Sequence, residues 1–538
     1  MLGTMMNFPL TLAPILERAG KLFSKVEVVS RLPGLGLGRC KYGDIYRRAR
    51  QLAHALQLAG LKPGDRVATL MWNHAQHVEA YFGIPVAGGI LHTLNLRLHA
   101  NELAYIVTHA RDRYLIVDDV LLPVYESIRS QVDFERVLVV PHGQVSVPNN
   151  CENYEDFLAG AIGDFIYPDL DENQAATMCF TSGTTGKPKG VLYSHRALVL
   201  HSLNECAADS FCLSQNDVAL PGSSMFHANA WGIPFTATMV GAKMVLPGPH
   251  LDPESLLDLI EGESVTFAAG VPTLWLGVLA ALENHPGRWN ISWTVRIGAG
   301  GSAVPESLLR GLDRFGFHIT HLWGMTETAP LASTGFVKST LAQCGEDHQY
   351  KIRGKQGIPS PFVELRVMGP SGEAPWDGVS YGELEVRGPW VAASYFESPE
   401  TCDRWTDDGW FKTGDIATID SEGYLKIVDR SKDLIKSGGE WISSVDIENA
   451  LMAHPAVREA AVIGVPHPKW QERPLAIMVR KEGMEVQADE LRALLAAQFA
   501  KWQMPDAFLF TNELPHTSVG KLLKLELRQQ YANWKWDQ

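Results

Sequence analysis

Residues 181–190, which read TSGTTGKPKG, combine the side chains that are needed to surround a polyphosphate. Glycines let backbone N–H groups turn toward an anion, hydroxyls donate further hydrogen bonds, and lysines add positive charge. The run lies between two apolar, strand-like stretches at residues 175–180 and 190–193. The pattern therefore predicts a phosphate-binding loop between two strands, and the alternative is a polar surface loop without a ligand.

The Walker A loop, G-x-x-x-x-G-K-[ST], is the obvious rival for such a run. Here Lys187 follows Gly186, but the next residue is Pro188. Proline offers no hydroxyl to a magnesium ion and does not let a helix start there in the normal way. The spacing between the glycines is also too short, so the Walker interpretation fails.

The elements that must position this loop alternate between strand and helix over roughly the first 310 residues. Short runs at residues 66–70, 114–117, 265–268 and 295–301 each lead into a helical pattern, and an apolar run at 137–140 closes the second of these units. Asp252 before Pro253 is typical of a helix N-cap followed by proline at the first helical position. Strands that alternate with helices predict an α/β fold with parallel sheets covered on both faces.

The pattern changes between about residue 355 and residue 428, where short strands alternate with tight turns. This stretch predicts a small β-barrel-like part at the end of a large N-terminal domain, residues 1–428. The remaining residues, 432–538, contain helical patterns at 444–453 and 488–502 and apolar strands. They are enough for a smaller α+β domain of their own.

Composition limits the partners. The 538 residues carry a formal net charge of −14 and a pI of about 5.7, which argues against a nucleic-acid partner. Seven cysteines without a C-x-x-C pair argue against a disulfide framework or a zinc site and fit a reducing cytoplasm. The N-terminus lacks a basic region before an apolar core, and no apolar stretch reaches 18 residues, so we expect no membrane span.

Five further motifs occur in order after the opening run. They are a glycine turn at 300–305, WGMTET at 323–328, WFKTGD at 410–415, DRSKD at 429–433 and PHTSVGK at 515–521. Together with residues 181–190 they resemble the signature motifs of the adenylate-forming, AMP-binding superfamily. Acyl-CoA synthetases, the adenylation domains of peptide synthetases and firefly luciferase belong to it. The resemblance implies that ATP activates a carboxylate, which is itself the nucleophile, so that no general base is needed.

The resemblance assigns the outer phosphates to the opening loop. Its expected hydrogen-bond donors are Thr181, Ser182, Thr184, Thr185 and Lys189, with Gly183 and Gly186 for close backbone approach. The second motif implies that Thr326 bonds the α-phosphate and that Glu327, with Thr184, ligates Mg²⁺. Trp323, Gly324 and Met325 would line the nucleotide site. A Thr-Glu pair that only caps a helix is the alternative.

The remaining nucleotide contacts follow from the other motifs. Gly300, Gly301 and Ser302 would lie against the adenine, and Asp415 and Arg430 would bind the ribose. Asp429 would be the pivot of a hinge at residues 429–431, about which a mobile C-terminal domain turns between two half-reactions. An aspartate that caps a turn and an ordinary charged linker are the alternatives.

Lys521 matches the adenylation lysine of the superfamily. Its ammonium would bridge the substrate carboxylate and the α-phosphate and so offset the repulsion between two reacting anions. A lysine near the C-terminus is otherwise usually exposed to solvent.

Two stretches narrow the resemblance to fatty acyl-CoA synthetases of the medium- and long-chain type, including bacterial medium-chain ligases and 3-methylmercaptopropionate–CoA ligases. The first, MFHANAWG at 225–232, implies that His227 lies near the reacting carboxylate and that Trp231 gates the acyl tunnel, with Gly301 and Gly324 beside them. The second implies that coenzyme A contacts Lys436, Ser437, Gly438, Gly439, Glu440 and Trp441.

A core-packing role is the alternative for Trp231. This chain has Gly222-Ser223-Ser224 where such relatives carry valine and proline, so a changed pocket wall or loop is possible.

These patterns predict an ATP- and Mg²⁺-dependent acid–CoA ligase that forms acyl-CoA, AMP and pyrophosphate, with a medium-chain fatty acid as the favoured small carboxylic acid. A 3-methylmercaptopropionate or aryl-acid ligase remains an alternative, as does an adenylation enzyme that loads a carrier protein. A non-catalytic nucleotide-binding protein is a third, against which the presence of Glu327, Asp415 and Lys521 argues. A homodimer is what the resemblance implies.

Overall fold

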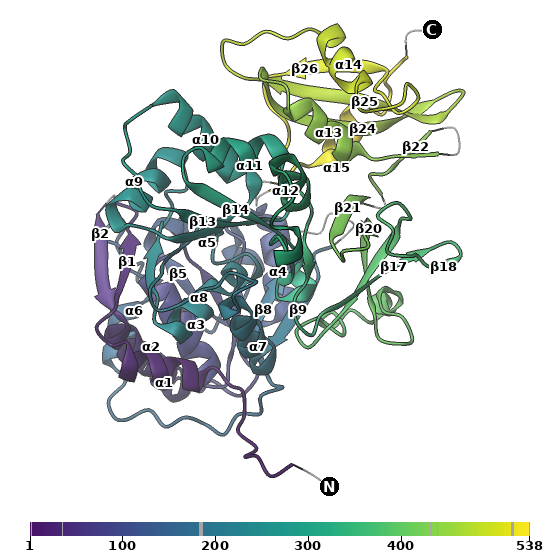
Figure 1. Ribbon diagram of the computed structural model, residues 1–538. Helices are drawn as coiled ribbons and strands as arrows, with labels where there is room; N and C mark the ends of the chain where they lie inside the picture. Colours follow the sequence, from purple (N-terminus) through teal and green to yellow (C-terminus); the bar gives the residue numbers. More distant parts are fainter. Residues whose placement is uncertain are drawn as a thin grey trace.

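A computed structural model describes the chain from residue 1 to residue 538 with a few gaps. The gaps are Leu2, Leu35, residues 182–186, Ser431, residues 438–439, 518–520 and 537–538, together with the side chains of Glu440 and Trp441. Figure 1 shows a large N-terminal body and a smaller C-terminal body, drawn in yellow-green, that sits on one side of it. Within the described residues, no helix is both long enough and apolar enough to cross a bilayer.

A nine-stranded sheet forms one half of the large body, in the order β16-β15-β14-β13-β12-β10-β11-β1-β2. Its strands are β1 (Glu27–Arg31), β2 (Leu37–Lys41), β10 (Val218–Pro221), β11 (Lys243–Leu246), β12 (Phe267–Gly270), β13 (Val295–Gly300), β14 (Phe317–Gly324), β15 (Leu331–Thr334) and β16 (Ile358–Pro359). The six central strands run parallel, whereas β2, β15 and β16 are antiparallel to their neighbours. This is the parallel sheet that the alternation of strand and helix predicts.

A seven-stranded sheet forms the other half, in the order β7-β6-β5-β3-β4-β8-β9. Its strands are β3 (Arg66–Leu70), β4 (Ile90–Thr93), β5 (Asp112–Asp118), β6 (Arg136–Val140), β7 (Glu152–Asn153), β8 (Ala175–Phe180) and β9 (Gly190–Ser194). All neighbours pair in parallel except β8 and β9, which form an antiparallel hairpin around the expected phosphate loop.

Helices cover both sheets. They are α1 (Ala13–Leu22), α2 (Tyr42–Leu58), α3 (Ala75–Val86), α4 (Ala100–Ala110), α5 (Leu122–Ile128), α6 (Tyr154–Ala159), α7 (His195–Cys206), α8 (Ile233–Val240), α9 (Pro253–Glu263), α10 (Pro272–Asn284), α11 (Glu306–Asp313) and α12 (Glu346–Arg353). The two sheets share one core, in which Phe235 of α8 packs against Tyr81 and Phe82 of α3 at ring-centroid distances of 5.2 and 5.6 Å. The predicted N-cap is confirmed, since the Asp252 side chain accepts a hydrogen bond from the Ser255 N–H.

The β-rich stretch forms a five-stranded antiparallel sheet in the order β18-β17-β19-β20-β21. Its strands are β17 (Glu364–Gly369), β18 (Gly372–Glu373), β19 (Gly382–Arg387), β20 (Phe411–Ile419) and β21 (Leu425–Arg430). The short 3-10 turns of the chain are η1 (Asp119–Leu121), η2 (Arg129–Gln131), η3 (Ala228–Gly232), η4 (Thr326–Thr328), η5 (Ser339–Leu341) and η6 (Pro399–Arg404).

The C-terminal body has its own sheet and its own cores. Its elements are β22 (Ile435–Ser437), β23 (Glu440–Ile442), α13 (Ser444–Met452), β24 (Val457–His467), β25 (Gln471–Arg480), α14 (Ala488–Ala496), β26 (Ala507–Thr511) and α15 (Lys524–Gln530). The expectation of a helix to residue 502 is wrong: α14 ends at Ala496. Turns follow it up to Pro505, and within them the Ala500 N–H donates to Gln503 Oε1 at 3.0 Å, a local bond that takes the place of a helical one.

Candidate active site

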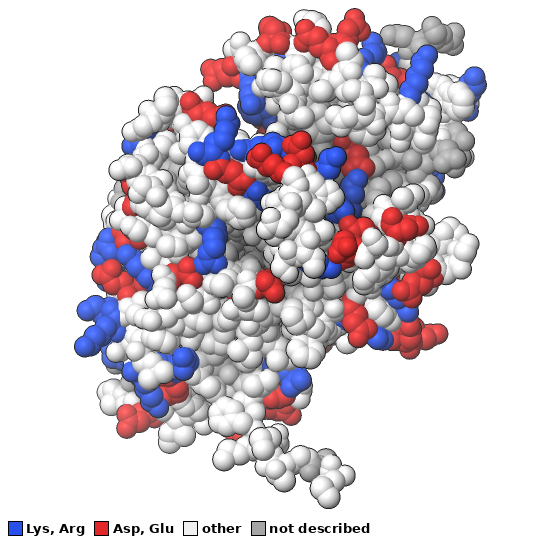
Figure 2. Space-filling model, in the orientation of Figure 1, with Lys and Arg blue, Asp and Glu red and all other residues white. Residues whose placement is uncertain are grey.

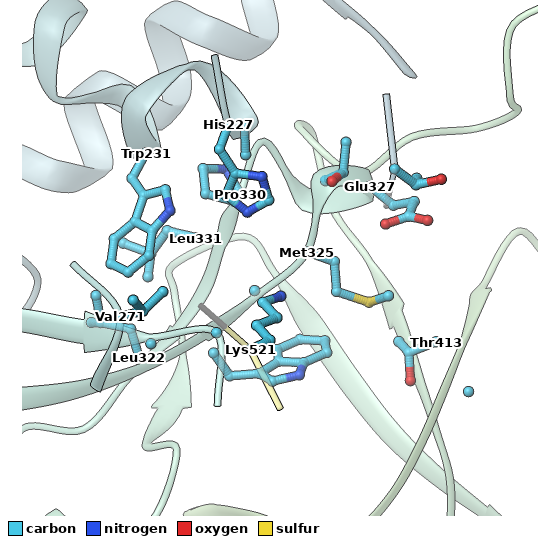
Figure 3. A pocket seen from close by; sticks show the side chains of 18 of the residues that line it. His227, Trp231, Val271, Leu322, Met325, Glu327, Pro330, Leu331, Thr413 and Lys521 are labelled. Atoms are coloured by element: carbon cyan, nitrogen blue, oxygen red, sulfur yellow. The ribbon is translucent and has the colours of Figure 1, made fainter. Parts of the chain in front are cut away.

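A cavity of about 230 Å³ lies where the carboxyl ends of the parallel strands meet the C-terminal body (Figure 3). Such strand ends are the usual place for a ligand in an open α/β sheet. Thirteen of the expected site residues line the cavity: Thr181, Lys189, His227, Trp231, Gly300, Gly301, Trp323, Gly324, Met325, Thr326, Glu327, Arg430 and Lys521. The cavity thus brings together segments from Thr181 to Lys521.

The ends of the expected phosphate loop are tied together at the mouth of the β8–β9 hairpin. The Thr181 N–H donates to the Lys189 carbonyl at 2.9 Å, and the Lys189 N–H donates to the Thr181 hydroxyl oxygen at 3.1 Å. The expected ligands Ser182, Gly183, Thr184, Thr185 and Gly186 lie outside the described residues. The hairpin therefore presents the two ends of the loop, with both end residues lining the cavity.

Glu327 lies in the turn η4 and is 5 % exposed. The Tyr395 hydroxyl donates to Glu327 Oε1, and burial together with this carboxylate raises the pKa of Tyr395. Among the described residues, Glu327 Oε2 has no hydrogen-bond partner, and the residue lines the cavity. Mg²⁺ prefers such a carboxylate oxygen together with substrate phosphates, so this donor fits the expected magnesium site.

The backbone of Thr326 is fixed by Tyr193, because the Tyr193 hydroxyl donates to the Thr326 carbonyl oxygen at 2.6 Å. The Lys189 ammonium stands 5.2 Å from the centre of the Tyr395 ring. Tyr193 and Tyr395 lie outside every sequence motif considered above, so only the fold connects them with Thr326 and Glu327.

Asp415 is 2 % exposed and already engaged on both carboxylate oxygens. Trp323 Nε1 donates to Oδ2 at 2.9 Å, and Arg430 Nε lies 2.8 Å from Oδ1. Asp415 pairs with Arg430 across the β20–β21 ladder, which explains why two separate motifs converge. These bonds fix the carboxylate in one orientation beside a second cavity of about 300 Å³ that also contains Gly301 and Ser302.

Lys521 enters the cavity from the C-terminal body, and Figure 3 shows its side chain directed toward the space between His227 and Glu327. A Cβ atom added at Gly301 would stand only 3.2 Å from Lys521 Cε, so glycine makes room for the lysine stem. Burial lowers the pKa of Lys521 to about 8, and the guanidinium of Arg430 adds to this effect. Residues 518–520, just before it, are outside the described chain.

Asp429 is 2 % exposed and holds the start of α13. Its Oδ2 accepts hydrogen bonds from the backbone N–H of Ser444, at 2.9 Å, and from the Ser444 hydroxyl. Lys524 Nζ lies 2.7 Å from Glu448 Oε1 and donates to the Ser444 hydroxyl oxygen at 2.6 Å. The predicted pivot is therefore packed into a buried polar network of the C-terminal body.

One wall of the cavity is apolar. Figure 3 shows Trp231, Val271, Leu322, Pro330 and Leu331 in this wall, and Phe211 also lines the cavity. His227 is the polar group beside this wall, and burial lowers its pKa to about 3, with the Lys521 ammonium as a further cause. A neutral imidazole thus faces a cationic lysine across a space that an apolar chain could fill.

The segment that carries Trp231 has an unusual backbone. From Ala228 to Trp231 the φ angles are 37°, 42°, 54° and 57°, and Gly232 continues with 81°. Left-handed backbone costs roughly 1–2 kcal/mol for each residue that has a Cβ atom and normally occurs at single positions. A left-handed turn of this length next to the cavity therefore needs strong support from its surroundings.

Residues 222–224 do not line the cavity. The Ser223 N–H donates to the Ala269 carbonyl at 3.1 Å, and the Ser224 carbonyl accepts from the His227 N–H at 2.9 Å. A Cβ atom at Gly222 would come within 2.8 Å of the Ala269 oxygen, which accounts for the glycine. These three residues therefore belong to a loop outside the described lining of the cavity.

Of the expected coenzyme A segment, the described residues Lys436 and Ser437 do not line the cavity. Lys436 is exposed on β22 and its N–H donates to Glu472, whereas Ser437 is buried and accepts a hydrogen bond from Arg473 at 3.0 Å. Gly438 and Gly439 fall outside the described residues, as do the side chains of Glu440 and Trp441. The structure thus brings together the expected adenylation residues and keeps the described part of the thiol segment apart from them.

Charges of both signs are interspersed over the face of the molecule in Figure 2. The cavity combines ammonium groups, a carboxylate suited to Mg²⁺ and an apolar wall, and the Arg430 guanidinium joins it to Asp415 in the second cavity. This set can hold a nucleotide triphosphate with its metal and place an anionic head and an apolar tail beside the α-phosphate.

Known proteins are similar to this chain over nearly its whole length. A model of the AMP-binding enzyme family matches residues 19–396, and a model of the AMP-binding enzyme C-terminal domain matches residues 446–521. The long-chain-fatty-acid–CoA ligase of Thermus thermophilus is 49% identical over 536 residues, 99% of this chain and 97% of that protein. The 3-methylmercaptopropionyl-CoA ligase of Ruegeria pomeroyi is 44% identical over 539 residues, 99% of each chain. The crystal structure of the anthranilate CoA ligase AuaEII in complex with anthranoyl-AMP has a TM-score of 0.86 at 25% identity, covering 97% of this chain and 98% of that one.

Proposed function

This chain belongs to the AMP-binding enzyme family and is an ATP-dependent acid–CoA ligase that works through an acyl-adenylate, and we propose that its acid is a medium-chain fatty acid. The observation that carries this choice is the apolar wall, which starts beside His227 and contains no charged side chain. The two relatives named above are named for a long-chain fatty acid and for a short thioether acid. A medium-chain fatty acid is intermediate in length between these two acids.

The proposed mechanism uses the described groups in order. The substrate carboxylate lies between Lys521 and His227 and attacks the α-phosphorus in line with departing pyrophosphate. Lys521 attracts both anions, while Thr326 donates to the α-phosphate. A neutral His227 can donate one hydrogen bond to the carboxylate without holding it as an ion pair. The coenzyme A thiol then displaces AMP.

Glu327 would hold Mg²⁺ together with Thr184 and the phosphate oxygens, and the ion supplies charge neutralisation on the phosphates when it is bound. Asp415 and Arg430 would hold the ribose, and Gly300 to Ser302 the adenine. We also propose a domain division at a hinge, residues 429–431, with Asp429 as the pivot, and an arrangement as a cytoplasmic homodimer. The resemblance to the family supports these last points.

A panel of acids tests the choice of substrate. Butyrate, octanoate, palmitate, 3-methylmercaptopropionate and benzoate would be compared by AMP formation with and without coenzyme A. The proposal requires the highest kcat/KM for octanoate and a dependence of turnover on coenzyme A. A maximum for 3-methylmercaptopropionate or benzoate would replace the proposed acid, and acyl-adenylate that accumulates regardless of coenzyme A would favour a carrier-protein acceptor.

The pH dependence of adenylation should report Lys521. Because its pKa is lowered to about 8, the ammonium is present below pH 8 and is lost as pH rises through that value. We expect kcat/KM for ATP to fall about tenfold per pH unit above this value, since kcat/KM follows the free enzyme. Bound anions raise the pKa of the lysine, so kcat should stay constant to higher pH. The Lys521→Arg variant keeps its charge and should lose this alkaline decline; an unchanged decline would assign the titration to another group.

Trp231→Ala should change which acids are used. The indole forms part of the apolar wall and is only 7 % exposed, so its removal enlarges the acyl site. We expect the ratio of kcat/KM for palmitate over octanoate to rise about tenfold, in line with the ~1–3 kcal/mol that pocket contacts contribute to discrimination, with KM for ATP unchanged. An unchanged chain-length profile with a lower melting temperature would assign Trp231 to core packing.

A further inference from the structure

The segment that carries His227 and Trp231 follows a strand of the nine-stranded sheet, but it is also held by residues of the seven-stranded half. Residues 221–232 run from the last residue of β10, in the nine-stranded sheet, to the start of α8. The partners described below come from the loop after β3 and from α3, β4 and β8, all in or on the seven-stranded half. The position of the acyl-site side chains therefore depends on hydrogen bonds across the boundary between the two sheets.

Asn73, in the loop after β3, forms hydrogen bonds with the first part of this segment. Its Nδ2 donates to the carbonyl oxygens of Pro221 and Ser223 at 3.1 and 2.9 Å, and its Oδ1 accepts from the Met225 N–H at 2.8 Å. The side chain is 1 % exposed, and two carbonyls and one N–H match only one orientation of the amide. The Tyr81 hydroxyl adds a bond to the Met225 carbonyl.

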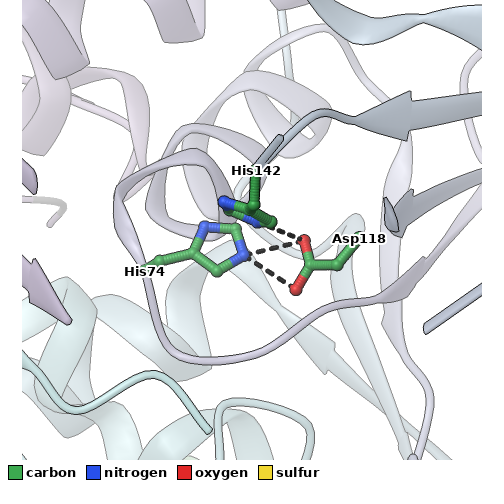
Figure 4. Close-up of side chains that lie close together, drawn as sticks. All are labelled: His74, Asp118 and His142. Atoms are coloured by element: carbon green, nitrogen blue, oxygen red, sulfur yellow. Dashed lines mark hydrogen bonds and ion pairs between the residues drawn. The ribbon is translucent and has the colours of Figure 1, made fainter. Parts of the chain in front are cut away.

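The turn that presents Asn73 is itself anchored on both sides (Figure 4). His74 Nε2 lies 2.8 and 3.0 Å from the two carboxylate oxygens of Asp118, and His142 Nε2 lies 3.2 Å from Oδ1. The Trp72 N–H donates to Asp118 Oδ2 at 2.8 Å. Residues 72 and 74 are thus fixed to one buried carboxylate, and Asn73 between them has little freedom to withdraw from the segment.

Asn229 ties the second part from within the left-handed turn η3. Its Oδ1 accepts a hydrogen bond from the Thr177 hydroxyl of β8 at 2.6 Å, and its Nδ2 donates to the Thr93 hydroxyl oxygen of β4 at 3.3 Å. The Thr93 hydroxyl in turn donates to the Phe226 carbonyl at 3.3 Å. Asparagine tolerates left-handed backbone better than the alanines and the tryptophan around it, so it is the natural point at which to hold the turn.

We propose that Asn73 and Asn229 are positioning residues of the acyl site, which hold residues 221–232 against the seven-stranded sheet and thereby set where His227 and Trp231 stand. The inference rests on the proposed assignment of the apolar wall to the acid. Neither asparagine lines the cavity, so neither touches the reacting groups. Their loss should impair the use of the acid while leaving the nucleotide side, built from other segments, in place.

Three variants test Asn229. Asn229→Ala removes both hydrogen bonds; Asn229→Gly removes them but accepts left-handed backbone freely; Thr177→Val removes one donor with little change in shape. We expect KM for octanoate to rise about tenfold to a hundredfold in both Asn229 variants, as small misplacements of reacting groups do, and less in Thr177→Val, with KM for ATP within about twofold. A glycine variant with the wild-type KM would show that backbone tolerance alone suffices and would overturn the role of these hydrogen bonds.

Asn73→Asp keeps the size and the acceptor of the side chain but loses both donors, so the carbonyls of residues 221 and 223 would face a carboxylate. We expect the same selective rise in KM for the acid. Hydrogen exchange of the 221–232 peptide should become faster in the Asn73 and Asn229 variants. This second measurement follows the segment itself and does not depend on activity.

Asn204→Ala is the matched control, because Asn204 is also a buried asparagine, 8 % exposed, and bonds Ser360 outside the cavity. It should lower the melting temperature without affecting KM for the acid or exchange at 221–232. If KM values for acid and ATP rise together, or follow the melting temperature across all variants including Asn204→Ala, the two asparagines are merely structural. Failure of the wild type to activate any acid would instead count against the proposed function, since the variants are compared only after that result.

Discussion

Lys521→Ala is expected to slow the formation of acyl-adenylate by about 10³-fold or more, on the scale of other groups that stabilise a developing charge, while supplied acyl-adenylate is still converted to acyl-CoA. The reason is electrostatic: two anions must approach within bonding distance, and the partly buried Lys521 ammonium points toward the space between His227 and Glu327. Attraction at that distance in a poorly hydrated site is far stronger than in water. Pyrophosphate release measures the first half-reaction, and chromatography of acyl-CoA measures the second.

A surface lysine of the same body provides the control. Lys501 is exposed, and Lys501→Ala should leave both half-reactions as they are. The melting temperature should be the same for both alanine variants, because Lys521 makes no described side-chain hydrogen bond or ion pair with another residue. Equal loss of both half-reactions with an unchanged melting temperature would contradict a role confined to adenylation.

The nucleotide side of the site could be predicted from the sequence because each part is a short contiguous motif. Thr181, Glu327, Asp415 and Lys521 occur in separate runs, and the structure places three of them around one cavity and Asp415 beside it. The sequence could not predict that Tyr395 bonds Glu327, since the two residues are 68 positions apart and Tyr395 belongs to no motif. A tyrosine in a β-rich stretch has no sequence signal that links it to a carboxylate.

The acyl side was less accessible to prediction. Its wall combines Phe211, Val271, Leu322 and Leu331, which are ordinary apolar residues in four different elements or loops. The left-handed turn could not be predicted from the sequence for a related reason. Residues 228–231 contain no glycine, and alanine and tryptophan favour right-handed backbone. Tertiary hydrogen bonds of Asn229 with Thr93 and Thr177 stabilise this conformation. The hydrophobic periodicity of the sequence does not indicate these bonds.

The fold itself followed from alternation of strand and helix, with the parallel strands where the apolar runs predict them. The sheet order required coordinates, because β10 and β12 are neighbours although β11 lies between them in sequence. The end of α14 at Ala496 shows the same limit on a smaller scale, since helical composition continues past the point where turns begin.

Glu327→Gln should reduce adenylation by about 10²- to 10³-fold, comparable to the loss of one preorganised charge-stabilising group, and should shift the Mg²⁺ dependence to higher concentration. The side chain keeps its shape and its acceptor oxygen for Tyr395, but the negative charge that attracts the cation disappears. The measurement is pyrophosphate release over a Mg²⁺ titration at fixed ATP. A higher Mg²⁺ requirement with a partly restored rate at saturation would show that the carboxylate acts through the metal.

Tyr395→Phe separates this role from simple packing around Glu327. It removes the hydroxyl that donates to Oε1 but leaves the carboxylate charge and the ring that stands over the Lys189 ammonium. Losing a hydrogen bond to a charged group costs ~1.5–3 kcal/mol at most sites, so we expect about a tenfold loss and a Mg²⁺ midpoint close to that of the wild type. If Glu327→Gln and Tyr395→Phe had the same rates and the same Mg²⁺ midpoints, the orientation of the side chain would explain both, and the carboxylate could not be a ligand of the metal.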